Sequence, residues 1–218
     1  MGTCNELNGG YAADGYARMN GAGAAVVTYC VGGFSILNAG AGAYAERVPM
    51  IVISGAPPTK RRETGALVHH LVANYDLQLD LFKKMTIDAA ILNDAETAPE
   101  LIDRLISKCL YHKLVVYLEL PADIALATCT KAQKTDFSPR YQSDANTLQA
   151  AVTAAAKMIN NARSPMLLAG IETLRFTLGN VTPQLVEGAE LPFATMLSSK
   201  SVLLELHRQV HRHLSGRL

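Results

Sequence analysis

Glu6 is the first side chain whose type and position could do chemistry. It closes the string Thr3-Cys4-Asn5-Glu6, directly before an alanine-rich stretch. The spacing of Thr3 and Glu6 is that of a capping box, in which the glutamate bonds back to the backbone of Thr3 at the start of a helix. The pattern favours this structural role. The functional alternative is a partly buried carboxyl that shares a proton with a ligand nitrogen.

The adjacent residues His69 and His70 are the second candidate. Metal chelation by a helix prefers histidines four residues apart, so this pair predicts no metal site. In the ordinary case, one histidine of such a pair is solvated and the other is hydrogen-bonded. The functional alternative is an acid/base pair on a loop, because histidine exchanges protons near neutral pH.

The segment Val31-Gly32-Gly33 follows an apolar run and predicts a tight turn from a strand into a helix. Glycines in such a turn let the backbone approach a ligand closely. The segment does not match the G-x-G-x-x-G fingerprint, and Gly21-Ala22-Gly23 precedes the apolar run instead of following it. The sequence therefore does not support a nicotinamide-dinucleotide site.

The end of the sequence is basic, and its apolar residues recur at helical spacing. These residues are Leu203, Leu206, Val210 and Leu214. The spacing predicts an amphipathic helix whose polar face is solvated. The histidines and arginines on that face are only a weak indication of a metal or RNA site.

Helical and β-prone segments alternate in the part of the chain that holds the first three candidates. Helices are predicted at 5–19, 34–47, 77–85 and 97–113, and strands at 24–29, 50–54, 86–92 and 114–120. A polar loop at 59–64 leads to the two histidines. Continuous apolar strands are typical of a sheet covered on both faces. Strands separated by helices imply an α/β fold with a parallel, doubly wound sheet.

The polar stretch 121–143 changes the character of the sequence and reads as a linker. A second α/β unit follows, with helices at 146–161 and 173–187 and strands at 165–169 and 192–196. Such a short run rarely closes its own sheet, so the second unit is expected to be partial. We expect a first domain at 1–125, a linker at 126–145 and a second domain at 146–218.

The composition excludes several classes of protein. The 218 residues are 49% hydrophobic and carry a formal net charge of +1. These values exclude a disordered chain and give no electrostatic footprint for nucleic acid. The sequence shows neither a membrane-spanning apolar run nor a secretory signal at its start. Four cysteines without a C-x-x-C pair favour reduced thiols in a cytoplasmic protein.

Residues 4–18, CNELNGGYAADGYAR, closely resemble the thiamine-diphosphate-dependent 2-oxo acid decarboxylases, which include pyruvate, indolepyruvate and phenylpyruvate decarboxylases. The similarity continues at 27–33, 43–46, 53–57, 67–70 and 116–121, and at 167–172 and 198–203 in the second unit. It covers nearly the whole chain. The motif at 4–18 and the histidine pair at the family's spacing make it specific. The acetolactate synthase group shares the glutamate but usually lacks the two histidines.

The resemblance implies roles for four residues. Glu6 matches the glutamate that hydrogen-bonds N1′ of the cofactor's aminopyrimidine, where a carboxyl stabilises the imino tautomer. Val31 matches the turn residue that packs near this ring. His69 and His70 match the active-site pair that positions the substrate and transfers protons. Thiamine diphosphate is the electron sink in this family, whose members convert a 2-oxo acid to an aldehyde and CO₂.

The resemblance also implies parts that this sequence lacks. The family has a strand, a loop and a helix before the glutamate, and a C-terminal domain whose G-D-G…N motif binds Mg²⁺ and the diphosphate. We therefore expect a pyrimidine-binding domain that is truncated at its N-terminus, followed by part of the family's middle domain. Residues 204–218 depart from the family pattern. This chain alone is expected to be inactive, and the full-length form to be a homodimer or homotetramer.

Two other classes of function stay open. The chain could be a non-catalytic or regulatory paralogue that pairs with a full-length enzyme of the family. A nucleotide-binding dehydrogenase domain is the third hypothesis, and the missing glycine fingerprint counts against it. The sequence does not distinguish pyruvate, phenylpyruvate and indolepyruvate as substrates.

Overall fold

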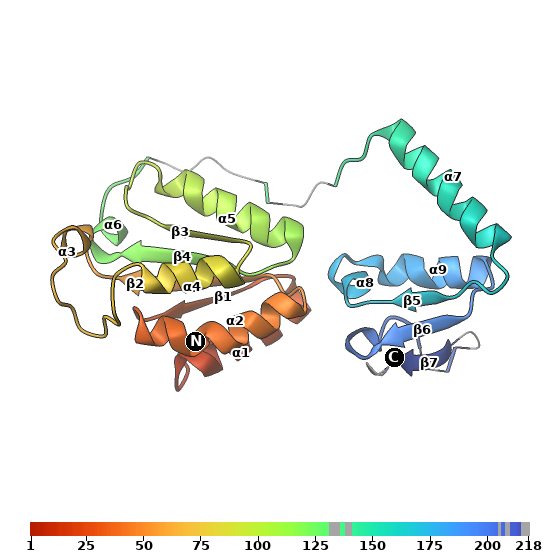
Figure 1. Cartoon of the computed structure of the whole chain (residues 1–218), viewed down its shortest axis with the longest axis horizontal. Coiled ribbons are helices and arrows are strands. Elements are labelled where there is room, and N and C mark those ends of the chain that lie inside the picture. The colour runs from red at the N-terminus through yellow and green to blue at the C-terminus, as the bar shows by residue number, and fades with distance from the viewer. Residues whose placement is uncertain (131–135, 138–140, 205, 208–209, 215–218) are drawn as a thin grey trace. The chain divides into compact units, whose positions relative to one another are not determined.

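The computed structural model describes residues 1–130, 136–137, 141–204, 206–207 and 210–214, the last of these ranges by its backbone only. The chain forms two compact units, Met1–Pro139 and Arg140–Leu218 (Figure 1). The division falls within the stretch 126–145, and the predicted domain boundaries on either side of it stay predictions. Among the described residues, no helix is long and apolar enough to cross a membrane.

The first unit is built on a sheet of four parallel strands in the order β1-β2-β4-β3. Its strands are β1 (Gly23–Val27), β2 (Met50–Ala56), β3 (Asp88–Ile91) and β4 (Val116–Pro121). Its helices are α1 (Glu6–Asn20), α2 (Val31–Ala45), α3 (Thr59–Glu63), α4 (Leu77–Met85), α5 (Ala98–His112) and α6 (Ala122–Ala125). The prediction of an α/β fold with a parallel sheet is confirmed.

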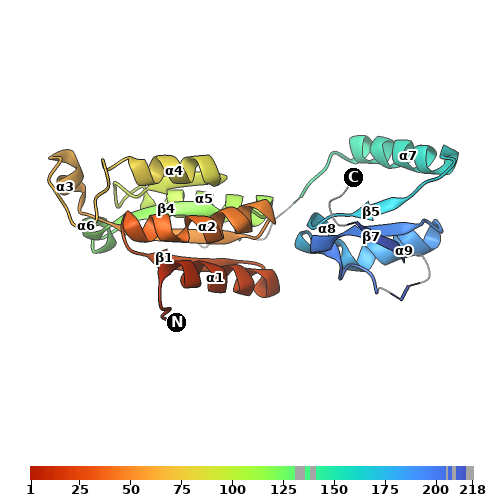
Figure 2. The same ribbon diagram turned by 60° about the horizontal axis from the view of Figure 1, so that its bottom comes forward.

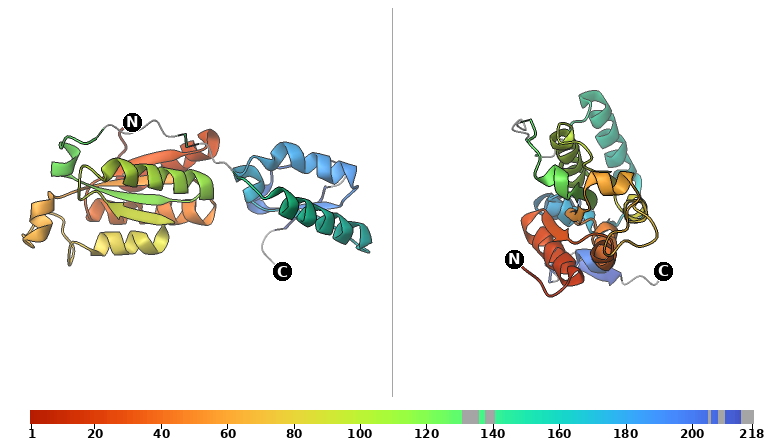
Figure 3. Two further views of the ribbon diagram at one scale, coloured as in Figure 1. Left: turned by 90° about the horizontal axis from the view of Figure 1, so that it is seen from above. Right: turned by 90° about the vertical axis from the view of Figure 1, so that its left-hand side faces the viewer.

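Helices cover both faces of this sheet. The long helices α2 and α4 lie side by side over one face (Figure 2), where their apolar side chains pack on β1, β2 and β4. Helix α5 covers the opposite face (Figure 3) and packs mainly on β3 and β4. Strand β4 lies inside the sheet, which is why its apolar residues run without the alternation of a half-exposed strand.

Small residues let α1 and α2 pack closely at one edge of the unit. A Cβ added at Gly10 of α1 would lie 2.6 Å from the Cβ of Ala39 in α2. Helix α1 then ends at Gly21, whose left-handed φ of 91° lets its N–H donate to Ala17 O at 2.8 Å. The helix predicted at 5–19 is confirmed, since α1 covers Glu6–Asn20.

Two local predictions in the first unit were wrong. Val31-Gly32-Gly33 forms the first helical turn of α2. The tight turn that joins β1 to α2 lies directly before it, at residues 28–30. The segment 59–64 is not a plain loop, because α3 occupies most of it. The carboxylate of Asp123 accepts hydrogen bonds from the N–H and hydroxyl of Thr59, at 3.0 and 2.6 Å, and so caps this short helix from a distant part of the chain.

The second unit contains a sheet of three parallel strands in the order β5-β6-β7. Its strands are β5 (Leu167–Ala169), β6 (Phe193–Met196) and β7 (Val210–Leu214). Its α-helices are α7 (Ala145–Asn161), α8 (Glu172–Arg175) and α9 (Val181–Gly188), and its 3₁₀ turns are η1 (Leu178–Asn180) and η2 (Leu197–Ser199). Phe193 and Val186 lie at the centre of its core.

Two predictions in the second unit were also wrong. The helix expected at 173–187 is broken into α8, η1 and α9, because Thr177 adopts a left-handed φ of 57° and Gly179 follows it in the 3₁₀ turn. The helix expected near the end of the chain is instead a strand at Val210–Leu214, which pairs with β6. The open edge of β6 supplies backbone partners that local spacing cannot reveal.

Candidate functional site

Glu6 is the first residue of α1, and it does not form the predicted capping box. The N-cap is Asn5, whose side-chain oxygen accepts the N–H of Asn8 at 2.9 Å. The hydroxyl of Thr3 donates to the carbonyl of Asn5 at 3.0 Å. Asparagine is a strong N-cap, so the helix begins after Asn5, and Glu6 stands too early in it to reach back to Thr3. The structural role that the pattern favoured for Glu6 is therefore wrong.

The carboxyl of Glu6 lies against the first turn of α2. A Cβ added at Gly32 would lie 2.8 Å from Oε1 of Glu6 and 2.4 Å from Oγ1 of Thr28. Only a glycine leaves room for the two side chains at this point. Glu6 is half-buried and, within the described part of the chain, makes no side-chain hydrogen bond or ion pair. Its carboxyl can therefore accept or donate a hydrogen bond to a ligand.

An open depression of about 510 Å³ adjoins Glu6. Its wall is formed by the first residues of the chain, the start of α1 and the end of β1, with Val27 and Thr28 among its lining residues. Concave surfaces of this size hold small molecules in many proteins. Val31, at the start of α2, is about half exposed and lies beside Gly32 in the same helical turn.

The turn into α2 is held in an unusual backbone conformation. Cys30 is fully buried and has φ 57° and ψ −83°, a combination that is costly for any residue with a Cβ. Its sulfur accepts the N–H of Val72 at 3.4 Å. The turn is thus tied to the segment that carries the two histidines.

His69 and His70 lie on the loop between α3 and α4, residues 64–76, which we call the His loop. Their rings face each other with centroids 3.8 Å apart and planes inclined by 31°. Both side chains are exposed, and the described residues give neither of them a hydrogen-bond partner. The loop position is confirmed, whereas the expectation that one histidine is hydrogen-bonded is wrong. The backbone of His70 has a left-handed φ of 66°.

The structure brings Glu6 and the His loop to the same turn. The carboxyl of Glu6 lies against Gly32, and the His loop bonds Cys30 through Val72. The turn follows β1, and the carboxyl ends of parallel strands meet at one edge of a sheet. Residues 28–33 therefore join the two candidate regions.

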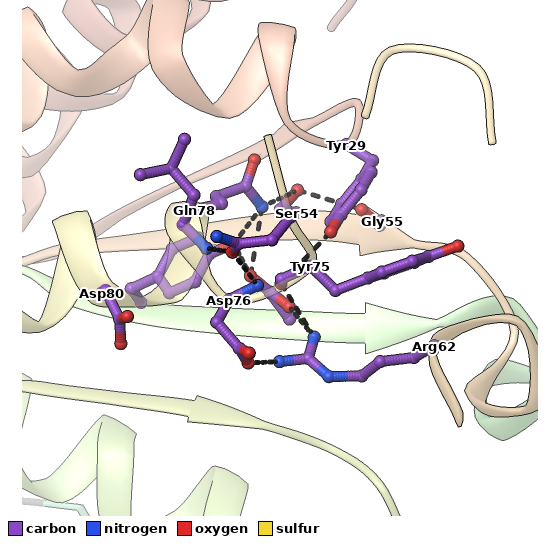
Figure 4. Close-up of polar contacts among 12 residues, drawn as sticks. Tyr29, Ser54, Gly55, Arg62, Tyr75, Asp76, Gln78 and Asp80 are labelled. Atoms are coloured by element: carbon purple, nitrogen blue, oxygen red, sulfur yellow. Dashed lines mark hydrogen bonds and ion pairs between the residues drawn. The ribbon is translucent and has the colours of Figure 1, made fainter. Parts of the chain in front are cut away.

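A buried polar network packs against this turn, and the meeting of its members was not predicted from the sequence. It consists of Ser54, Gln78, Tyr117 and Glu119, all of them fully buried. Figure 4 labels two of them, Ser54 and Gln78. The Gln78 amide donates to the Ser54 hydroxyl at 3.0 Å and to the Tyr117 hydroxyl. The Tyr117 hydroxyl donates to Oε1 of Glu119 at 2.9 Å. One signal was present: Glu119 is a charged residue inside an otherwise apolar strand.

The buried polar network contacts the turn at two residues, Thr28 and Gly33. Ser54 donates from its hydroxyl to the carbonyl of Thr28 at 3.3 Å. A Cβ added at Gly33 would lie 2.2 Å from Oε1 of Gln78. The two glycines at the start of α2 thus face different partners, Gly32 facing Glu6 and Gly33 facing the network.

Burial dominates the protonation of the network. It raises the pKa of Glu119, against the opposing effect of hydrogen bonds from Tyr117 and Gln78 and of the charge on Arg62. Burial, together with the nearby Glu119 charge, also raises the pKa of Tyr117, so its hydroxyl keeps its proton and remains a donor. Oε2 of Glu119 makes no hydrogen bond within the described structure and lies 3.8 Å from Nη1 of Arg62.

Comparison with known proteins matches residues 1–78 to the thiamine pyrophosphate enzyme N-terminal TPP binding domain. Pyruvate decarboxylase 2 of Arabidopsis thaliana is 39% identical over 214 residues, which are 95% of this chain and 35% of that protein. Pyruvate decarboxylase 1 of Oryza sativa subsp. japonica is 38% identical over 213 residues, again 95% of this chain and 35% of the relative. The chain thus spans about a third of the length of these relatives. Over nearly all of its length, the chain is similar to part of the thiamine-diphosphate-dependent 2-oxo acid decarboxylases.

Proposed function

We propose that the first unit is the pyrimidine-binding part of a thiamine-diphosphate-dependent enzyme that converts a 2-oxo acid to an aldehyde and CO₂. The observation that carries the proposal is the carboxyl of Glu6, half-buried against Gly32 and without a partner among the described residues. A carboxyl in this setting suits a ring nitrogen that has to gain and lose a proton. The names of the relatives support pyruvate as the substrate to test first.

The residues around Glu6 fit an aminopyrimidine. The carboxyl stands in the first turn of α1 and also against the first turn of α2, where the backbone N–H groups of helices favour negative charge. Glu6 would hold the proton at the ring nitrogen, and Val31 would give the ring an apolar contact. Bound thiamine diphosphate would supply the electron sink for decarboxylation.

The His loop would serve the substrate side of the reaction. Its two exposed histidines carry ring nitrogens that can form hydrogen bonds and orient a carboxylate. We propose that they position the 2-oxo acid and return a proton to the product. Groups of this kind typically contribute about 10²- to 10⁴-fold to a rate.

The remaining requirements of the reaction are proposed to lie in the rest of the whole protein. The resemblance puts the groups that bind Mg²⁺ and the diphosphate in a further domain, and the cofactor between two subunits. A homodimer or homotetramer of the full-length form is therefore part of the proposal, as is the inactivity of these 218 residues alone. The four free cysteines favour a cytoplasmic protein.

A chimera tests the proposal. Residues 1–200 would replace the matching part of Arabidopsis thaliana pyruvate decarboxylase 2, and aldehyde release from pyruvate would be measured with and without Glu6→Gln. We expect Glu6→Gln to lower kcat/KM by about 10² or more. The matched control is Glu100→Gln, an exposed glutamate in the first turn of α5, which should leave kcat/KM unchanged. An active chimera in which both variants equal the parent would overturn the role of Glu6.

A further inference from the structure

The His loop has no helix or strand of its own, and a few contacts fix its shape. The hydroxyl of Tyr75 donates to the carbonyl of Ala66 and ties the two ends of the loop together. The carbonyl of Tyr75 accepts the hydroxyl of Tyr29 at 3.3 Å and Nη1 of Arg62 at 3.0 Å. Residue 75 is therefore one point at which the loop is held to the rest of the unit, in addition to the Val72 N–H that bonds the sulfur of Cys30.

Arg62 makes the charged contacts at this point. Its guanidinium donates from Nη2 to the carboxylate of Asp76 (Figure 4). Its Nη1 lies 3.8 Å from Oε2 of Glu119. An arginine presents its donors in a rigid planar fork, so one side chain can hold several acceptors in fixed geometry. Arg62 thus bonds both residues at the end of the His loop and faces a carboxyl of the sheet.

The side chain of Glu119 is held in the core and cannot move together with the His loop. Its side chain is fully buried, and its Oε1 accepts hydrogen bonds from Tyr117 at 2.9 Å and Gln78 at 3.3 Å. Taking a carboxyl out of water makes a nearby cation strongly favourable. The network therefore holds the guanidinium of Arg62 in a fixed position. Arg62 in turn holds Tyr75 and Asp76 through its hydrogen bonds to them.

We propose that Arg62 is a positioning residue for His69 and His70. The buried carboxyl of Glu119 fixes the guanidinium, the guanidinium fixes the carbonyl of Tyr75, and the closed loop then holds the two histidine rings against each other. The inference concerns the loop itself and does not depend on any ligand or reaction. It is therefore testable on the 218-residue chain without cofactor and can fail separately from the proposed function.

Hydrogen exchange by NMR on Arg62→Gln tests the inference. The loop contains backbone N–H groups that are bonded within the unit. They belong to Ala66, Leu71, Val72 and Asn74. We expect them to exchange about tenfold faster in Arg62→Gln, because the loop opens more often without its anchor. The ring-proton shifts of His69 and His70 should move toward those of free histidine as the rings separate.

A second variant separates positioning from general stability. Arg62→Gln alone leaves Glu119 as a buried charge without its cation, which destabilises the whole unit. Arg62→Gln combined with Glu119→Gln removes that charge, so exchange in β2 and β4 should return toward the parent values while the loop stays fast. The matched control is Arg61→Gln, an exposed neighbour in α3, which should leave the loop unchanged.

Two results would overturn the inference. The first is a double variant whose loop exchanges as slowly as the parent's. The second is loop and core exchange that rise and fall together in both variants, which would make Arg62 an ordinary contributor to stability. If Arg62→Gln alone does not fold, the double variant decides, because it carries no unpaired buried charge.

Discussion

Two sets of polar side chains lie on either side of the turn at 28–33, in opposite environments. The candidate site residues, Glu6 and the histidine pair, are half-buried or exposed, and their side chains make no hydrogen bond or ion pair in the described structure. The buried polar network on the other side is fully enclosed, and each of its side chains bonds at least one other. The candidate site residues are free to bind a ligand. The buried polar network holds the backbone of the turn at 28–33, against which Glu6 lies.

This difference in burial predicts that mutations in the two sets of residues will have different costs. An exposed polar group exchanges a protein partner for water at little cost, whereas a buried one that loses its partner keeps its full desolvation penalty. Substitutions in the network should therefore act mainly on stability, and those at Glu6 and the histidines mainly on activity. This division between stability and activity is testable by substitution.

The largest effect is expected for Glu119→Ala. The variant removes the acceptor of the Tyr117 hydroxyl and the anion that faces Arg62, and it leaves a cavity. We expect it to lower the free energy of unfolding by about 3 kcal/mol. Urea denaturation would measure the loss. Glu63→Ala, on the exposed surface of α3, should change the unfolding free energy by less than about 0.5 kcal/mol. Equal losses of unfolding free energy in Glu119→Ala and Glu63→Ala would contradict the assignment of a stabilising role to the network.

A pH series with Glu119→Gln should give a smaller effect of known sign. Burial raises the pKa of Glu119 above its ordinary 4.5, so between these two values the folded chain binds the proton more tightly than the unfolded chain. The parent therefore loses stability as the pH rises from about 4.5 through the raised pKa, and glutamine at this position removes that loss.

The measurement is the unfolding free energy of parent and variant between about pH 4 and pH 7. The difference should shift in favour of Glu119→Gln as the pH rises. A difference that is constant with pH would show that Glu119 has the same pKa in both states. A shift in the opposite direction would show that Arg62 and the hydrogen bonds outweigh burial.

The sequence predicted the framework well because its signals are local. The apolar runs at β1, β2 and β4 and the glycine after α1 each carry their own information. The motif around Glu6 and the two adjacent histidines also stood out, since each is continuous in the chain. The depression beside Glu6 and the absence of a capping box did not follow from these patterns, because both depend on where the helix begins.

The supporting residues were not predictable in the same way. Ser54, Gln78 and Glu119 come from two strands and a helix, and only Glu119, a charged residue in an apolar strand, stands out in the sequence. Their meeting is a consequence of the strand order, in which β4 lies beside β2. The cap of α3 by Asp123 and the strand at Val210–Leu214 were missed for the same reason, because the partner lies far away in the sequence.

The smallest effect, and the one that tests the turn itself, is expected from Cys30→Gly compared with Cys30→Ala. Both variants lose the contact of the sulfur with the N–H of Val72, so the comparison isolates the backbone. At φ 57° and ψ −83° an alanine keeps the strain of its Cβ and a glycine does not. We expect the glycine variant to be more stable than the alanine variant by about 1 kcal/mol, although glycine gains entropy in the unfolded chain.

The two thermal or urea unfolding curves decide the point, with exchange at Val72 as a check that both variants lose the same contact. If the alanine variant is as stable as the glycine variant, the backbone of the turn is not strained, and the buried polar network does not have to hold it against strain. If glycine is more stable, then contacts such as that of Ser54 with Thr28 hold a backbone that would otherwise relax. The buried side of the turn would in that case fix the geometry of the side that faces Glu6.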